Sequence, residues 1–152
     1  MIEWLIKFIQ AEINLFTSSK LKKRGEITKE EIKELFKENS KTINLPPFQL
    51  YVIDQKYSTA NFEDLKSFLF KDLTDASTYK KEINDCDDFA IKLWAKVKKS
   101  NPTFAFGFAV SSSHAFNIFI DDKKKIWIVE PQTDKIFEYK KQSKYKLKMV
   151  II

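Results

Sequence analysis

FAFGFAVSSSHAFNIFIDDKKKIWIVE, residues 104–130, is the stretch that decides the fold. Three short runs within it are rich in aromatic and β-branched residues, and polar turns separate them. The runs are Phe104–Val110, His114–Ile120 and Ile126–Val129. This pattern is typical of consecutive antiparallel strands. We therefore expect a β-meander that ends at Glu130-Pro131.

A helix is expected immediately before this meander. From Asp85 and Cys86 onward, apolar residues recur at helical spacing as far as Val97. Lysines fill the last turn, where they suit the negative end of the helix dipole, and Asn101-Pro102 ends the segment. Because Cys86 falls in the first turn, unpaired N–H groups and the positive end of the dipole favour a negatively charged sulfur there.

The flanking sequence adds further elements. Thr28 and Glu31 form a capping box before a helix that runs to about Asn39, and Thr59 or Asn61 can cap another helix. The remaining expected strands are Phe48–Ile53, Ile136–Tyr139 and Lys146–Ile152. Helices thus concentrate in the first half and strands in the second, which predicts an α+β fold rather than alternating βαβ units.

The domain organisation follows from the same pattern. We expect residues 1–44 to form a helical N-terminal extension and residues 45–152 the main domain, with both in one compact unit. Met1–Phe16 has one apolar helical face, which indicates a helix that packs on the core or a partner, or lies on a membrane surface. Charges interrupt it and no small-residue cleavage site follows, so we expect neither a signal peptide nor a transmembrane segment.

The composition excludes several classes of protein. One cysteine forms no internal disulfide, and one cysteine with one histidine cannot complete a four-ligand structural zinc site. Two glycines cannot supply a glycine-rich phosphate loop. The net charge of +6 comes almost wholly from lysines spread along the chain, since Arg24 is the only arginine. We therefore expect no specific nucleic-acid binding, which relies on arginine for bidentate contacts.

Three residues together indicate cysteine chemistry. Such chemistry needs a thiolate, a neighbouring imidazole and a group that orients the imidazole. The candidates are Cys86 at a helix start, His114 at a strand start and Glu130 at the end of the next strand. Each also has a structural interpretation: a buried core cysteine, a surface histidine and an ordinary acid at a strand end.

The strand register decides whether the last two residues can meet. Pairing of Ile120 with Lys124 would place His114 directly opposite Glu130. Pairing of Ile120 with Ile126 would offset them by two residues but keep them on one face. An odd register would put them on opposite faces, and the interaction would be lost.

Acidic residues surround the cysteine. Asp85, Asp87 and Asp88 flank Cys86, and carboxylates raise the pKa of a neighbouring thiol and oppose the thiolate. A reactive thiol in this position therefore requires that the acids point away or that a cation covers them.

This order of residues resembles the arrangement in papain-like and transglutaminase-like cysteine enzymes, which have a cysteine on a helix, a histidine on a strand and an acid on the next strand. The strings DCDDFA (85–90), HAFN (114–117) and EPQT (130–133) are similar to one family in particular. It is typified by the calcium-dependent cysteine protease domain of the Marasmius oreades agglutinin, and it has stand-alone members in bacteria and phages. The resemblance covers about Phe48–Thr133.

The resemblance implies a papain-like or transglutaminase-like fold, with the nucleophile helix packed on an antiparallel sheet. It implies that Cys86 is the nucleophile, His114 the general base and Glu130 the orienting acid.

It also implies a calcium site at Asp87, Asp88 and Gln132, and a calcium ion would cancel the acids beside the thiol. Papain-like enzymes usually carry a glutamine upstream of the cysteine that donates a hydrogen bond to the oxyanion. Gln49 and Gln55 are both available for this role, and the backbone N–H of Cys86 is a further candidate donor.

We therefore expect a calcium-assisted cysteine hydrolase acting on the peptide or amide bonds of a peptide or protein substrate. A transglutaminase-like acyl transferase differs only in its second step, and the sequence does not separate the two. The alternative is a non-enzymatic virus- or phage-type accessory or virion domain that keeps the fold and binds a partner. We expect a cytoplasmic location, with the virion as the alternative, and the oligomeric state stays open.

Overall fold

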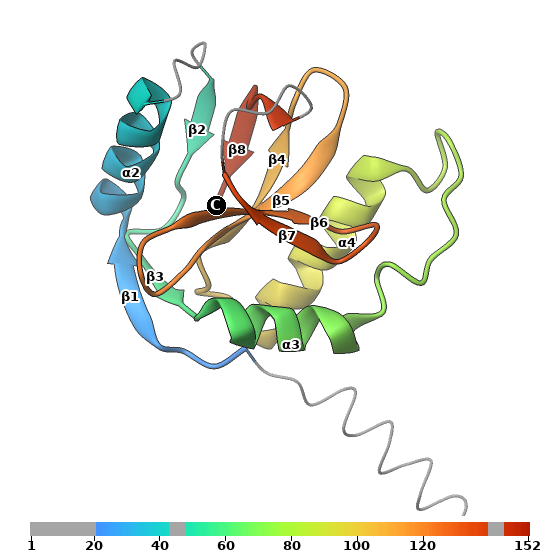
Figure 1. The fold of residues 1–152 in the computed structure, drawn as a ribbon, viewed down its shortest axis with the longest axis horizontal. Helices are drawn as coiled ribbons and strands as arrows, with labels where there is room; N and C mark the ends of the chain where they lie inside the picture. Colours follow the sequence, from blue (N-terminus) through green and yellow to red (C-terminus); the bar gives the residue numbers. More distant parts are fainter. Residues whose placement is uncertain (1–20, 43–47, 140–144) are drawn as a thin grey trace, which may run out of the picture.

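The computed structural model describes residues 21–42, 48–139 and 145–152 (Figure 1). The expected helix over Met1–Phe16 lies outside these ranges. The helices of the described ranges are α2 (Lys29–Thr42), α3 (Phe62–Asp72) and α4 (Cys86–Ser100). The strands are β1 (Gly25–Thr28), β2 (Gln49–Tyr51), β3 (Lys56–Thr59), β4 (Phe106–Val110), β5 (Ala115–Ile120), β6 (Ile126–Glu130), β7 (Lys135–Glu138) and β8 (Met149–Ile151). In the described ranges, no helix has the length and apolar character needed to cross a membrane.

The helix starts confirm the predicted caps. The Thr28 N–H donates to Glu31 at 2.8 Å, and the Glu31 N–H donates to the Thr28 hydroxyl at 3.3 Å, which is the reciprocal capping box of α2. The Asn61 side chain accepts from the Asp64 N–H at 2.7 Å and caps α3. Helix α4 begins at Cys86, as expected. These contacts span three residues, so the local sequence determines them.

The main sheet has six strands in the order β2-β8-β4-β5-β6-β7. The expected meander forms β4 to β7, and all of its neighbouring pairs are antiparallel. The prediction of a purely antiparallel sheet is wrong, because β2 pairs with β8 in parallel at the edge. The C-terminal strand β8 inserts between β2 and β4, so it pairs with residues about a hundred positions earlier in β2 and about forty positions earlier in β4. Hydrophobic pattern does not encode strand direction at that distance.

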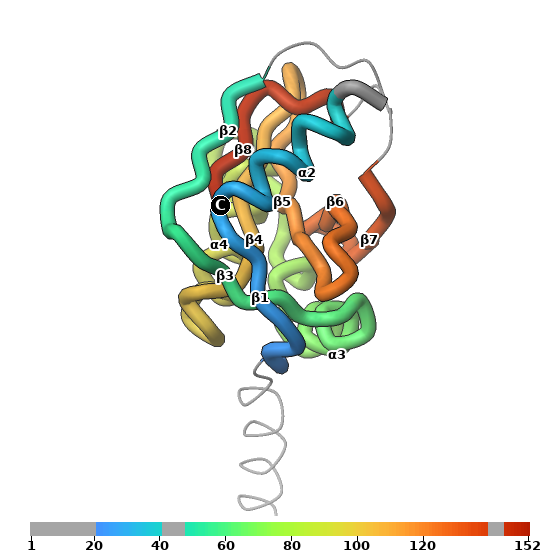
Figure 2. The backbone as a smooth tube through the Cα atoms, turned by 90° about the vertical axis from the view of Figure 1, so that its left-hand side faces the viewer, coloured from blue at the N-terminus to red at the C-terminus, as the bar shows by residue number. Residues whose placement is uncertain are grey.

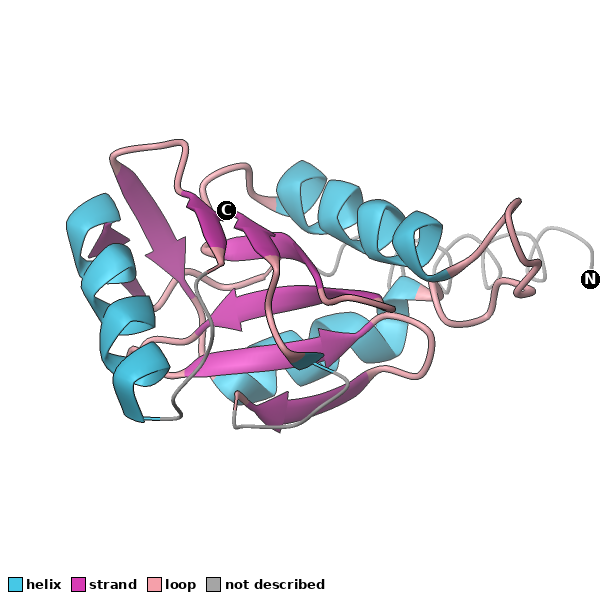
Figure 3. Ribbon diagram, turned by 90° about the horizontal axis from the view of Figure 1, so that it is seen from above, coloured by secondary structure: helices cyan, strands magenta, loops and turns pink. Residues whose placement is uncertain are grey.

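Helices cover both faces of this sheet. On one face α4 packs against β4 and β5, and α3 joins it through an apolar cluster that includes Leu65, Leu93 and Phe119. On the other face α2 contributes Ile32 and Phe36 to a second cluster with the alternate residues of the strands. Figure 2 shows α2 in front of the strands with α4 beyond them, and Figure 3 shows the sheet between the two helices.

A second, two-stranded sheet pairs β1 with β3. Neither strand was predicted, since β1 is only four residues long and ends at the Thr28 of the capping box, and β3 is too short and polar to stand out. Residues 25–42, which were assigned to the N-terminal extension, pack into the same core as the main sheet through Ile27, Ile32 and Phe36.

Candidate functional site

Cys86 is the first residue of α4 and is half-buried. Asp85 precedes it as the N-cap, and the Asp85 N–H donates to the Asp88 carboxylate at 3.2 Å. The sulfur therefore lies beside the free N–H groups at the positive end of the helix dipole. A helix with an apolar stripe toward the sheet and an N-cap just before the cysteine fixes this position.

His114 and Glu130 meet across neighbouring strands. The structure pairs Ile120 with Ile126, which is the register that offsets the two residues by two positions on one face. The His114 Nε2 and Glu130 Oε2 atoms are 2.7 Å apart, and the two side chains are only 9% and 6% exposed. The carboxylate thus holds the imidazole through Nε2 and leaves Nδ1 as the ring nitrogen for a second partner.

Tyr145 completes this arrangement, although no sequence pattern indicated it. Its hydroxyl donates to the same Glu130 Oε2 atom at 3.0 Å, and its ring lies edge-on to His114 with centroids 5.9 Å apart. Burial and the nearby Glu130 carboxylate raise the pKa of Tyr145 to about 12, so the phenol keeps its proton. Phe116 also stacks on the imidazole with centroids 6.0 Å apart, and its ring meets the Tyr145 ring edge-on at 5.1 Å. The histidine is therefore held by a carboxylate and two aromatic rings.

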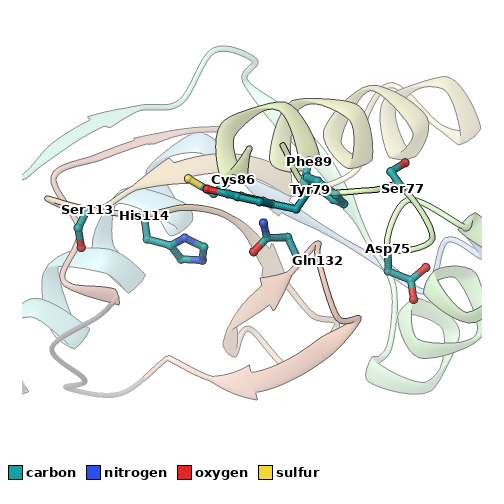
Figure 4. A pocket seen from close by; sticks show the side chains of 8 residues that line it. All are labelled: Asp75, Ser77, Tyr79, Cys86, Phe89, Ser113, His114 and Gln132. Atoms are coloured by element: carbon teal, nitrogen blue, oxygen red, sulfur yellow. The ribbon is translucent and has the colours of Figure 1, made fainter. Parts of the chain in front are cut away.

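Cys86 and His114 line one pocket of about 510 Å³ (Figure 4). The sheet wall of this pocket consists of Ser113, His114 and Gln132. The loop wall consists of Asp75, Ser77 and Tyr79, which belong to the connection between α3 and α4, and the helix adds Cys86 and Phe89. Figure 4 shows Cys86 and His114 approaching the pocket from opposite sides. Within the described residues no hydrogen bond joins Cys86 to His114.

Two of the candidate oxyanion donors do not line this pocket. Gln49 and Gln55 both belong to the described part of the chain, and neither lines the pocket. Gln49 lies on the edge strand β2, where it accepts a hydrogen bond from Tyr51 at 3.4 Å. The aromatic Tyr79, which no sequence pattern indicated, lines the pocket instead.

The acids beside Cys86 have different roles. Asp85 and Asp87 are hydrogen bonded to each other, which lowers the pKa of Asp85 and raises that of Asp87. Ligand atoms of Asp85, Cys86 and Asp87 lie within 4.8 Å of one another. Asp88 instead caps the helix, and Gln132 lines the pocket. Among the expected calcium ligands Asp87, Asp88 and Gln132, only Asp87 belongs to this group, and its neighbouring carboxylate there is Asp85.

A second group of acids joins Asp75 of the loop wall to Asp72 and to Asp134 in the turn between β6 and β7. Burial, with the Asp75 and Asp72 carboxylates adding to it, raises the pKa of Asp134 to about 7. Lys96 partly offsets this charge, since it forms an ion pair with Asp72 at 2.8 Å and donates to the Thr74 hydroxyl at 3.0 Å. Lys96 thereby ties the start of the loop to α4.

No protein-family model matches the sequence, and no curated protein matches it. Solved structures do match. A PSL1a–E64 complex has a TM-score of 0.68 and 22% identity, over 86% of this chain and 52% of that chain. Polyporus squamosus lectin bound to the human-type influenza-binding epitope Neu5Acα2-6Galβ1-4GlcNAc has a TM-score of 0.62 and 22% identity, over 86% and 50% of the two chains. This chain therefore shares a fold with, and spans about half the length of, these proteins.

These structures correct three predictions. The expected papain-like or transglutaminase-like fold is wrong, because the solved structures with this fold are those of a fungal lectin. The expected calcium-assisted cysteine hydrolase is wrong for the same reason, since one of these structures holds a sialylated glycan. The alternative of a virus- or phage-type accessory or virion domain has no counterpart among them. A shared order of motifs does not fix an activity, because sites are grafted onto folds.

The peptide or protein substrate gains no support from these structures either. The resemblance of the three motifs to the peptidase family stays a prediction, and so does the cytoplasmic or virion location. The roles of Cys86, His114 and Glu130 do not depend on the similar structures, because they are argued from the geometry of this chain.

Proposed function

We propose that the pocket is a nucleophilic thiol site. His114, oriented by Glu130, takes the proton of Cys86, and the sulfur then forms a covalent bond with an electrophilic carbon of a bound ligand. The observation that supports this function is the buried hydrogen bond of 2.7 Å between His114 and Glu130, in a pocket that Cys86 also lines. The covalent bond to the ligand is the whole of the proposed chemistry.

The structural interpretations of these residues fit less well. A core cysteine lies among apolar side chains, whereas Cys86 is half-buried between acids at the edge of a pocket. A surface histidine has no need of a buried carboxylate, whereas His114 has one in Glu130. Burial of both partners costs desolvation free energy, and a role in positioning the imidazole accounts for that cost.

An electrophilic ligand also has support among the similar proteins. E64, a small molecule with an epoxide ring, is the compound named in complex with PSL1a. A thiolate opens such a ring by attack at carbon, and the ring oxygen then takes a proton. For this chain we propose the same class of ligand, namely a small molecule with an electrophilic carbon next to an oxygen.

Alkylation kinetics test the thiol site directly. The chain has one cysteine, so any adduct with iodoacetamide reports on Cys86. We expect the wild-type protein at pH 6 to react at least roughly tenfold faster than a free thiol, because a helix N-terminus and an imidazole favour the thiolate. The His114→Asn variant should lose this advantage while its circular dichroism stays unchanged. A wild-type rate no faster than that of a free thiol would overturn the proposal.

Glycan binding is the second candidate, because one of the structures with this fold holds a sialylated trisaccharide. The pocket combines the aromatic ring of Tyr79 with the polar side chains of Ser77, Ser113 and Gln132, which suits a sugar. The trisaccharide Neu5Acα2-6Galβ1-4GlcNAc, titrated by calorimetry against the wild type and Tyr79→Ala, tests it. Binding that Tyr79→Ala abolishes supports a glycan site in this pocket, and no heat at millimolar ligand excludes it.

We propose separately that Asp85 and Asp87 take a calcium ion, with Asp88 and Gln132 as further candidates from the motif. Two carboxylates in contact must share a proton or a cation, and calcium prefers oxygen ligands. Calcium should raise the melting temperature of the wild type and leave that of Asp87→Asn unchanged. Calorimetry measures both melting temperatures, with the same concentration of magnesium in place of calcium as the control. An equal shift in both proteins would contradict this site.

A further inference from the structure

Tyr79 extends over the pocket from the loop wall. Its side chain is 54% exposed, although it belongs to the lining of the pocket together with Cys86. Figure 4 shows the phenol ring running along the pocket from the loop, with its hydroxyl at the end where the sulfur lies. A large exposed aromatic side chain in this place points its polar end at the proposed reaction centre.

Hydrogen bonds hold the loop on both sides of this tyrosine. The Lys80 N–H donates to the Asn84 carbonyl at 2.9 Å, and the Asn84 N–H donates to the Lys80 carbonyl at 2.7 Å. The Asn84 side chain donates to the Thr78 carbonyl at 2.5 Å and accepts a hydrogen bond from Lys92 of α4. Tyr79 is therefore placed relative to the helix that begins with Cys86.

The proposed covalent step needs a donor at this position. When a thiolate attacks a carbon bonded to oxygen, the electron pair of the breaking bond moves to that oxygen, which becomes negative. Enzymes and reactive binding sites stabilise such an oxygen with preorganised donors, among them tyrosine hydroxyls. Gln49 and Gln55 do not line the pocket, so they do not supply this hydrogen bond.

We propose that the Tyr79 hydroxyl donates the hydrogen bond to the oxygen that becomes negative when Cys86 attacks its ligand. This inference rests on the proposed thiol site. For an epoxide, a sulfur–carbon bond forms and a carbon–oxygen bond of the ring breaks. The proton that left the thiol for His114 ends on the ring oxygen, so the product is a thioether and an alcohol. Tyr79 donates a hydrogen bond during this step and keeps its own proton.

Two alkylating reagents separate this role from a merely structural one. Opening of an epoxide such as E64 places negative charge on oxygen, whereas iodoacetamide releases iodide and develops no charge on an oxygen at the reacting carbon. The Tyr79→Phe variant should therefore react with the epoxide roughly tenfold or more slowly than the wild type, yet react with iodoacetamide at the wild-type rate. Tyr51→Phe is the matched control, because Tyr51 is 50% exposed on β2 and lies outside the pocket lining.

The outcomes are distinguishable. If Tyr79→Phe and the wild type open the epoxide at equal rates while both react rapidly with iodoacetamide, the role of Tyr79 is excluded and the thiol site stands. If Tyr79→Phe slows both reagents equally, the tyrosine shapes the pocket without donating to the oxygen, and the inference is again excluded. If the wild type reacts with iodoacetamide no faster than a free thiol, the proposed function itself fails.

Discussion

The two walls of the pocket are built in opposite ways. The sheet wall lies at the ends of β5 and β6, where His114, Glu130 and Tyr145 form a hydrogen-bonded group with little exposure to solvent. The loop wall belongs to residues 73–85, where Tyr79 and Ile83 are 54% and 76% exposed. Packing and strand register therefore position the imidazole of the sheet wall, whereas the loop wall presents its side chains to solvent.

This contrast separates positioning from recognition. A general base must keep its geometry, which a buried sheet provides, whereas ligand contacts are often carried by loops on a rigid scaffold. We infer that changes in the sheet wall affect folding and the reactivity of Cys86, while changes in the loop wall affect the choice of ligand. Four predictions test this difference.

The largest effect is expected at Gly107 in β4. A Cβ atom here would lie 2.7 Å from Cγ1 of Ile152 and even closer to the Ile151 carbonyl oxygen. Because backbone cannot give way cheaply, Gly107→Ala should lower the free energy of unfolding by about 3 kcal/mol. Urea denaturation measures this, with Gly25→Ala as the control, since its Cβ would meet only the flexible Thr59 side chain at 3.0 Å. Equal losses in both variants would contradict the prediction.

Glu130→Gln tests the sheet wall without changing its volume. The amide cannot hold an imidazolium as the carboxylate does at 2.7 Å, so the alkylation rate of Cys86 at pH 6 should fall roughly tenfold or more. The measurement is the second-order rate constant with iodoacetamide as a function of pH. An unchanged pH profile in a folded variant would show that Glu130 does not act on His114.

Asp134, in the turn between β6 and β7, gives a pH-dependent effect through the acids near the loop wall. Its pKa is raised from 3.8 to about 7, so the folded state binds this proton more tightly than the unfolded state does. The stability contributed by the neutral form is therefore lost as the pH rises from about 4 to about 7. Asp134→Asn removes the charge and tolerates the positive φ of 55°.

We expect this variant to match the wild type near pH 4. At pH 8 its melting temperature should be on the order of 2–4 °C higher, the shift that about 1 kcal/mol produces in a chain of this size. Calorimetry at the two pH values measures both. A constant difference at the two pH values would show that Asp134 does not titrate in this range.

The smallest effect is expected for Ile83 in the same loop. Its side chain is 76% exposed, so Ile83→Ser should change the free energy of unfolding by less than about 0.5 kcal/mol. Leu69→Ala, at a buried position of α3, should cost about 2–5 kcal/mol and serves as the contrast. A loss above about 1 kcal/mol at Ile83 would mean that the loop wall is part of the core.

The local elements were largely predictable. The capping box at Thr28 and Glu31, the Asn61 cap and the start of α4 at Cys86 were all expected, because each depends on residues within one turn. The offset register of Ile120 and Ile126 was one of two even registers left open, and it brings His114 to Glu130.

Non-local contacts were not predictable. The short strands β1 and β3 carry no strong pattern of their own, and each is stable only because the other lies beside it. Tyr145 follows Glu130 by 15 residues, and its hydrogen bond to that carboxylate depends on how the chain returns after β7. Tyr79 belongs to a polar loop that has no periodicity, so nothing marked it as part of the pocket.

The sequence by itself determined which atoms were available: one thiol at a helix start, one imidazole and an acid at a strand end, with acids around the sulfur. Spacing and capping placed these on their elements, because such interactions act within a few residues. Only the tertiary structure decided that α4 and the β5–β6 hairpin face one pocket, that β8 enters the sheet between β2 and β4, and that Tyr145 closes on Glu130. Those contacts join distant segments through packing, and no local pattern encodes them.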